Sequence, residues 1–203
     1  MRCKVRRALF PEHIVDLEKS GISLSYALSE GIYSSNRNTI TKLLGYPPNN
    51  VVQSALVFPY SNKDFFRLKL FPSYKGPEGT TKYLQPQGSS PHLYVPKFAR
   101  KALETPGDYF FITEGEKKAL AACQKGLPCI AIGGLWNWIR KGQPIADLDD
   151  INWLARGVGL VPDSDVWESE RSDLFCAVFA FGKELNKRGA TSDLIIIPKG
   201  ERL

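Results

Sequence analysis

The sequence has few of the side chains that build metal sites or disulfide frameworks: two histidines and four cysteines among 203 residues. No two cysteines form a C-x-x-C pair, so we expect no zinc site. The sequence contains no run of about 18 apolar residues, the length that a membrane span needs. The basic residues 1–7 also lack the apolar core of a signal peptide. We therefore expect a soluble, cytoplasmic protein with no membrane partner. Cys123 and Cys129 lie in apolar runs, where a reduced cysteine acts as a small hydrophobic residue.

Charge is distributed unevenly along the chain. Residues 1–107 contain 15 Lys+Arg and 7 Asp+Glu, a net charge of +8, whereas residues 108–203 contain 12 and 14, a net charge of −2. A basic segment joined to a mildly acidic one suits a polyanion that is gripped by one part while the other holds a metal ion. We predict a basic N-terminal subdomain over 1–107 and a catalytic domain over 108–203, with an ordinary basic protein as the alternative.

The first half of the chain predicts a small helical cap followed by a β-rich segment. Residues 10–33 predict two short helices, and residues 39–44 predict one more helical turn. The runs 51–60 and 65–71 are rich in β-branched and aromatic residues and predict a β-hairpin. This basic subdomain is therefore expected to combine a helical cap with a small sheet.

From residue 108 onward, apolar strands alternate with helical segments. Strands are expected at 109–113, 129–132, 157–161 and 194–197, and helices at 116–125, 148–156 and 172–188. Strands that are uniformly apolar and separated by helices indicate a parallel sheet covered on both faces. We therefore predict an α/β fold with a Rossmann-like parallel sheet, in which ligands bind beyond the carboxyl ends of the strands.

Acidic residues follow two of the predicted strands. Glu114 comes directly after the first strand, and Asp163 and Asp165 come directly after the third. Aspartates at i and i+2 can project to one side and supply the oxygen ligands that Mg²⁺ prefers. Three converging carboxylates would repel one another unless a divalent cation lay among them. The alternatives are a turn or helix cap for the aspartates, and a helix capping box formed by Thr113 and Glu116.

The order of these features resembles the Toprim domain shared by bacterial primases, topoisomerases and some nucleases. The resemblance rests on a strand followed by Glu114-Gly115 and a helix, a strand followed by Gly133-Gly134, and a strand followed by Asp163-x-Asp165. Nearly the whole chain is similar to an uncharacterised Toprim-related domain of phage, plasmid and integrative-element replication proteins, which often precedes a helicase. The segments that carry this closer similarity are Leu17 to Gly21, Tyr83-Leu84-Gln85-Pro86, Thr113 to Ala119, and Gly134-Leu135-Trp136-Asn137-Trp138.

The resemblance implies primase-like nucleotidyl transfer, in which primers are made on a single-stranded DNA template from nucleoside triphosphates during replication of a mobile genetic element. It implies that Glu114 is a metal ligand or general acid/base, and that Asp163 and Asp165 bind Mg²⁺ or Mn²⁺. A replicative helicase is the implied protein partner. Such domains commonly continue beyond the point where this sequence ends, so a fragment of a larger protein and an accessory protein are both open.

Six further residues are candidates for contacting nucleic acid or nucleotides: Arg67, Lys69, Lys82, Tyr83, Lys117 and Lys118. The first four resemble the basic subdomain that precedes the Toprim part of bacterial primases, and Arg67 and Lys69 lie on one face of a strand. Lys117 and Lys118 open a helix, where the macrodipole disfavours cations, so a nearby anion is expected. The alternatives are a solvated strand face for the first group and pairing with neighbouring glutamates for the two lysines.

Two other functions for the same residues remain open. A Toprim nuclease would use the carboxylates to cleave DNA or RNA phosphodiesters, and a catalytically idle accessory would bind nucleic acid without turnover. Topoisomerase activity is disfavoured, because 203 residues leave little room for a strand-passing gate.

Several aromatic and histidine side chains are ambiguous from the sequence. Trp136 and Trp138 follow a pair of glycines in a loop, where an exposed indole can stack on nucleobases. We expect one of the two to be a core residue. His13 and His92 are far from the carboxylate motifs in sequence, and we treat both as structural.

Overall fold

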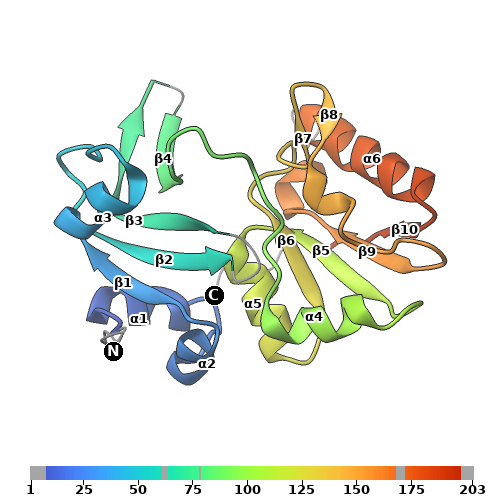
Figure 1. Cartoon of the computed structure of the whole chain (residues 1–203), viewed down its shortest axis with the longest axis horizontal. Helices are drawn as coiled ribbons and strands as arrows, with labels where there is room; N and C mark the ends of the chain where they lie inside the picture. Colours follow the sequence, from blue (N-terminus) through green and yellow to red (C-terminus); the bar gives the residue numbers. More distant parts are fainter. Residues whose placement is uncertain (1–7, 61–63, 78, 168–171, 198–203) are drawn as a thin grey trace. The chain divides into compact units, whose positions relative to one another are not determined.

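The structure, a computed structural model, describes residues 8–60, 64–77, 79–167 and 172–197, without the side chain of Asp165. The chain divides into two compact units, Met1–Ser89 and Ser90–Leu203 (Figure 1). The division falls earlier in the chain than the boundary at 107/108 expected from the sequence. Residues 90–107 belong with the second unit, where the backbone of Tyr94 pairs with that of Ala131.

This division makes the charge asymmetry smaller than expected from the sequence, because the second unit is neutral and not acidic. Residues 1–89 contain 12 Lys+Arg and 6 Asp+Glu, whereas residues 90–203 contain 15 of each. The whole net charge of +6 therefore belongs to the first unit. If the protein binds a polyanion through its net charge, the first unit is the part suited to it.

The first unit is an antiparallel sheet with helices on both faces. The strands β1 (Tyr33–Asn36), β2 (Ser54–Tyr60), β3 (Phe65–Gly76) and β4 (Gly79–Leu84) lie in the order β1-β2-β3-β4, and the helices are α1 (Pro11–Glu18), α2 (Leu24–Ser29) and α3 (Arg37–Leu44). Ile40 and Leu44 of α3 pack against one face, in a buried cluster with Leu68. On the opposite face, the ring centroid of His13 in α1 lies 4.2 Å from that of Phe71. The predicted helical cap and hairpin are confirmed.

The second unit is built on a parallel sheet. The strands β5 (Phe110–Glu114), β6 (Cys129–Ile132), β9 (Gly157–Val161) and β10 (Thr191–Leu194) lie in the order β10-β9-β5-β6. Helix α6 (Ser172–Lys187) covers one face, and α4 (Lys97–Glu104) and α5 (Glu116–Gln124) cover the other (Figure 1). The connection from β6 to β9 contains the short pair β7 (Ile139–Arg140) and β8 (Gln143–Pro144) and the 3₁₀ helix η1 (Ala146–Leu148). The predicted α/β class, with helices flanking a parallel sheet, is confirmed.

The helix predicted over residues 148–156 is wrong. After η1 the chain runs irregularly, and the Trp153 indole donates a hydrogen bond to the carbonyl of Leu148 (2.6 Å). The side chain of Asn152 accepts a hydrogen bond from the backbone N–H of Leu154 (3.2 Å). Such local side-chain contacts compete with the backbone bonds of a helix.

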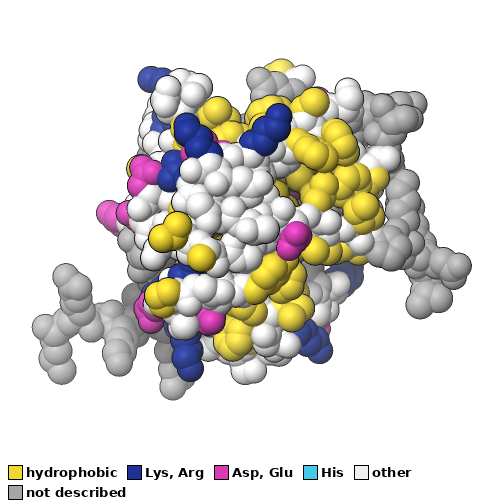
Figure 2. Space-filling view, turned by 90° about the vertical axis from the view of Figure 1, so that its right-hand side faces the viewer, with side chains coloured by type: hydrophobic (Ala, Val, Ile, Leu, Met, Phe, Trp, Pro, Cys, Tyr) yellow, Lys and Arg dark blue, Asp and Glu magenta, His cyan; other side chains and the backbone are white. Residues whose placement is uncertain are grey.

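The last strand also differs from its prediction. The strand forms at Thr191–Leu194, paired with β9, and not at 194–197, where Ile196 is 64% exposed. Phe175 and Phe179 on α6 are also exposed, with ring centroids 4.4 Å apart. Figure 2 shows hydrophobic side chains gathered on one face of the molecule. Within the described ranges, no helix has the length and apolar character needed to cross a bilayer.

The strand order fixes where a ligand would bind in the second unit. From β5 the chain crosses to β6 on one side, and from β9 it crosses to β10 on the other, so the order reverses between β5 and β9. At such a switch point the connections leave the carboxyl ends in opposite directions and open a crevice, where ligands of open α/β sheets bind. Glu114 ends β5, and Asp163 follows the end of β9.

Candidate functional site

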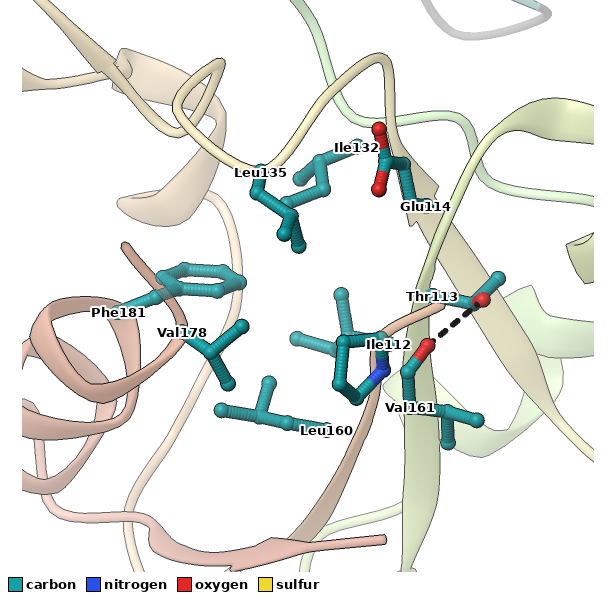
Figure 3. Close-up of a pocket in the computed structure, with 10 residues that line it drawn as sticks. Ile112, Thr113, Glu114, Ile132, Leu135, Leu160, Val161, Val178 and Phe181 are labelled. Carbon is teal, nitrogen blue, oxygen red and sulfur yellow. Dashed lines mark hydrogen bonds between the residues drawn. The ribbon is translucent and has the colours of Figure 1, made fainter. Parts of the chain in front are cut away.

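A pocket opens at the carboxyl ends of β5 and β9. Most of its lining is apolar and comes from the strands β5, β6 and β9, the loop after β6, and α6, including Ile112, Leu160 and Phe181. Figure 3 shows the apolar side chains facing one another across the pocket, with the carboxylate of Glu114 at its rim. The predicted position of Glu114, at the end of a strand beside a crevice, is confirmed.

Thr113 joins the ends of the two strands. Its hydroxyl donates a hydrogen bond to the carbonyl of Val161 on β9 (3.0 Å; Figure 3). The hydroxyl therefore does not cap α5, and the capping-box alternative is wrong: Gly115 is the N-cap, without a capping side chain. Gly115 has a φ of 88°, which glycine adopts at little cost, and this allows the sharp turn from β5 into α5.

Asp163 is held by a cation from the neighbouring element. Its carboxylate forms an ion pair with Lys118 in the first turn of α5, and both side chains are nearly half exposed (44% and 48%). The sequence predicts an anion near Lys117 and Lys118 at the start of this helix. For Lys118 that anion is Asp163, which follows the end of the neighbouring strand β9. The pair ties together the two segments that leave the carboxyl ends of β5 and β9.

Asp165 belongs to the 3₁₀ helix η2 (Ser164–Trp167), and its side chain lies outside the described residues. Among the side chains that the structure describes, no three of His, Cys, Asp and Glu are grouped closely enough to hold a metal ion. Of the three predicted carboxylate ligands, the structure therefore describes the side chains of two, Glu114 and Asp163. They lie at the ends of adjacent strands, at the same edge of the sheet.

Glu114 and Asp163 supply carboxylate oxygens, the ligand type that Mg²⁺ prefers, and they lie at the ends of adjacent strands. Mg²⁺ keeps several water molecules and is commonly bound through one or two carboxylates together with the phosphates of a substrate. The ammonium group of Lys118 already pairs with Asp163, so a metal ion at this carboxylate would have to displace it. Glu114 and Asp163 would thus be the described ligands of the ion.

The loop that follows β6 closes the site on the side of Glu114. A Cβ atom on Gly134 would lie 3.9 Å from Oε1 of Glu114 and 3.3 Å from Nδ2 of Asn137. Glycine at position 134 therefore leaves space between the carboxylate of Glu114 and the amide of Asn137. A larger residue would fill that space. Asn137 is therefore a polar neighbour of the site that sequence reasoning did not single out.

The two loop tryptophans have different surroundings. Trp138 is 5% exposed and stacks on Phe181 of α6, with ring centroids 5.3 Å apart. Trp136 is 45% exposed. The expectation that one of the two is a core residue is confirmed.

In the first unit, the predicted nucleic-acid residues do not all share a surface. Lys69 is paired with Asp16 of α1, and the guanidinium of Arg67 lies 4.9 Å from the ring centroid of Tyr83. The register, which pairs Lys69 with Tyr83, puts these three on one face of the sheet, whereas Lys82 alternates to the other face, where it is exposed. The structure thus brings Arg67, Lys69 and Tyr83 together and separates Lys82 from them.

Two further groups in the second unit have well-defined surroundings. Asp147, 5% exposed, accepts hydrogen bonds from the backbone N–H of Leu93 (2.9 Å) and from Nδ1 of His92 (2.8 Å). His92 thus anchors the segment beside β6, in keeping with the structural role expected from the sequence. Burial raises the pKa of Cys129 to about 12, so this thiol stays protonated at neutral pH and is a poor metal ligand.

No curated protein and no solved structure matches the chain. Residues 102–202 match the family model described as "Domain of unknown function (DUF3854)". The matched segment begins in α4 and contains every strand of the parallel sheet, together with Glu114, Asp163 and the loop that carries Trp136.

Proposed function

We propose that the protein catalyses metal-dependent nucleotidyl transfer on single-stranded DNA, as in primer synthesis during replication of a phage, plasmid or other mobile element. The observation that carries the proposal is that Glu114 lies at the carboxyl end of β5 and Asp163 follows that of β9, the adjacent strands at the switch point of the parallel sheet. The Toprim resemblance of the surrounding motifs and the basic first unit support it. A replicative helicase is the proposed partner.

In this reaction a 3′-hydroxyl attacks the α-phosphate of a nucleoside triphosphate, and pyrophosphate leaves. A bound Mg²⁺ or Mn²⁺ would offset the charge on the phosphate oxygens. Asp163 and Asp165 would hold the ion, and Glu114 would either complete its ligand shell or take the proton of the attacking hydroxyl. Lys118, now paired with Asp163, can turn its ammonium group to a substrate phosphate instead.

The proposed test is synthesis on an unprimed single-stranded circle with labelled nucleoside triphosphates and Mg²⁺ or Mn²⁺. We expect labelled product from the wild type, and a loss of at least about 100-fold in Asp163→Asn and Glu114→Gln, which remove charge but keep shape. The matched control is Asp149→Asn, because its carboxylate is 70% exposed and lies away from the pocket. Product formation that survives both site substitutions would contradict the assignment, and a shortened template would indicate a nuclease.

A second function is favoured by one specific observation, the ion pair between Lys118 and Asp163. In a catalytically idle accessory, this lysine would replace the metal permanently, and the protein would bind nucleic acid without turnover. Lys118→Met separates the two proposals. In an idle protein the substitution would raise Mn²⁺ affinity at Asp163 and produce no synthesis, whereas in an active enzyme it would lower the synthesis rate, because a phosphate contact is lost.

A further inference from the structure

The loop between β6 and β7 exposes one aromatic side chain, Trp136, on a hydrogen-bonded turn. The backbone N–H of Asn137 donates to the carbonyl of Gly134 (2.8 Å), which closes a tight turn with Leu135 and Trp136 at its tip. Leu135 is 9% exposed and lines the pocket, and Trp138 is stacked in the core. Leu135 and Trp138, which lie on either side of Trp136 along the loop, are therefore buried, while the indole of Trp136 is 45% exposed.

This turn lies next to the candidate site. Gly134, which begins it, is the residue whose Cβ would approach Oε1 of Glu114 to 3.9 Å. Leu135 and Glu114 line the same pocket. Trp136 is therefore two residues after Gly134, the loop residue that faces the Glu114 carboxylate. It lies at the edge of the sheet where a ligand would enter.

The charges around the turn favour a base over a phosphate as the group that meets Trp136. The neighbouring Glu114 carboxylate repels an anion unless a cation lies between them. Exposed cations follow shortly after the turn, Arg140 and Lys141 on the β7–β8 hairpin, and Arg140 also donates to the hydroxyl of Ser90. A neutral aromatic face followed by exposed cations is the combination that single-strand binding proteins use, with a base on the ring and the backbone along the charges.

We propose that Trp136 is a stacking platform for an unpaired nucleobase of the strand or nucleotide held at the Glu114 site, with the amide of Asn137 beside the same opening. The proposal rests on the proposed function, and it narrows the ligand to one that presents a free base. Such stacking is tolerant of sequence, because every base has a π-face.

The test is a fluorescence titration of the full chain with oligothymidylate and with an abasic strand of the same length. Stacking quenches an indole, so we expect oligothymidylate to quench the wild type and the quenching to be largely lost in Trp136→Phe. Trp136→Ala should weaken binding of oligothymidylate by about 5-fold to 150-fold and leave binding of the abasic strand unchanged. The matched control is Phe179→Ala, which removes an aromatic ring of similar exposure (46%) from α6.

The outcomes separate this inference from the proposed function. Equal affinity for the two strands, or quenching that persists in Trp136→Phe, would overturn the stacking role even if DNA synthesis is observed. Quenching that depends on Trp136 in a protein that makes no product would support the stacking role and count against nucleotidyl transfer. If the wild type binds neither strand, both proposals are wrong.

Discussion

Arg156 shows how a single buried charge can hold a unit together. Its side chain is 1% exposed, and its guanidinium donates hydrogen bonds to the backbone carbonyls of Ala102 (2.8 Å) and Leu103 (2.6 Å) at the end of α4. It also donates to the carbonyl of Asn152 (2.5 Å) and lies over the ring of Phe110. Burial lowers the pKa of this guanidinium, and the carbonyl dipoles compensate for part of the lost hydration.

We predict that Arg156→Met lowers the free energy of unfolding by about 3 kcal/mol, because several buried carbonyls lose their donor at once. Urea denaturation followed by circular dichroism measures this loss. The matched control is Arg188→Met, whose ion pairs with Asp149 and Glu184 lie nearer the surface, and here about 1 kcal/mol or less is expected. Similar losses in the two variants would contradict the role assigned to Arg156.

His13 is a buried polar residue in the first unit. Its side chain is 0% exposed; Nδ1 lies 2.7 Å from the hydroxyl of Ser34, and Nε2 lies 3.0 Å from that of Ser54. Burial lowers the pKa of His13, although the carboxylates of Glu12 and Asp16 oppose the shift. The neutral imidazole is therefore the form that the folded protein keeps at neutral pH.

The lowered pKa of His13 predicts a loss of stability at acidic pH. Below the unfolded pKa of about 6.5 the unfolded chain binds a proton that the folded chain does not, so stability falls as pH decreases, by at most about 1.4 kcal/mol per pH unit. We expect this fall in the wild type between pH 7 and 5.5, and a flatter profile in His13→Gln. Parallel profiles from urea denaturation would contradict the assignment. Glu12, whose pKa is lowered mainly by a backbone hydrogen bond, titrates below this range.

At the scale of elements, the sequence predicted the bounds of two strands with a buried centre. The strands at 129–132 and 157–161 have the predicted bounds, because each is a short apolar run bounded by proline, glycine or arginine. The helix prediction for 148–156 was wrong because side-chain hydrogen bonds determine the path of this segment. Trp153 donates to the carbonyl of Leu148, and Arg156 donates to that of the distant Ala102. Local pattern carries no information on such partners.

The candidate site was predictable to the same extent. The places of Glu114 and Asp163 follow from the rule that the carboxyl ends of parallel strands share one edge. The pairing of Lys118 with Asp163 and the closeness of Gly134 to Glu114 depend on how α5 and the loop after β6 leave the sheet. Residues 45 and 20 positions apart meet there through loop geometry, which spacing alone does not specify.

Asp147 connects two elements of the second unit, and this makes a testable prediction. It joins η1 to the segment that pairs with the edge of β6, through Leu93 and His92. We predict that Asp147→Asn lowers the free energy of unfolding by about 1 to 3 kcal/mol, because an amide cannot accept both hydrogen bonds with one oxygen. Asp149→Asn, two residues away and 70% exposed, should change it by less than about 0.5 kcal/mol in the same urea titration. Equal losses of unfolding free energy in the two variants would contradict a stabilising role for the buried hydrogen bonds of Asp147.

At the scale of the whole molecule, the two units divide the charge and the carboxylates between them. The first unit carries the net charge of +6, and the second carries Glu114 and Asp163 with no net charge. Binding of a polyanion should therefore depend on salt through the first unit, because release of counterions follows the number of phosphates contacted. A substitution that abolishes catalysis at Glu114 or Asp163 should then leave binding of the polyanion unchanged.

The strand pair β3–β4 offers a direct test of this division. Lys75 and Lys82 are exposed, and the register of the two strands places them on the same face. If both contact phosphates, the double substitution Lys75→Gln/Lys82→Gln should reduce the slope of log affinity against log salt by about 1.4, since each contact on a single strand contributes about 0.7. Lys183→Gln/Lys187→Gln removes the same charge from exposed positions on α6 and should leave the slope unchanged. Equal reductions in the two double variants, measured by anisotropy of a labelled oligothymidylate, would mean that charge acts through the whole protein and not through the basic unit.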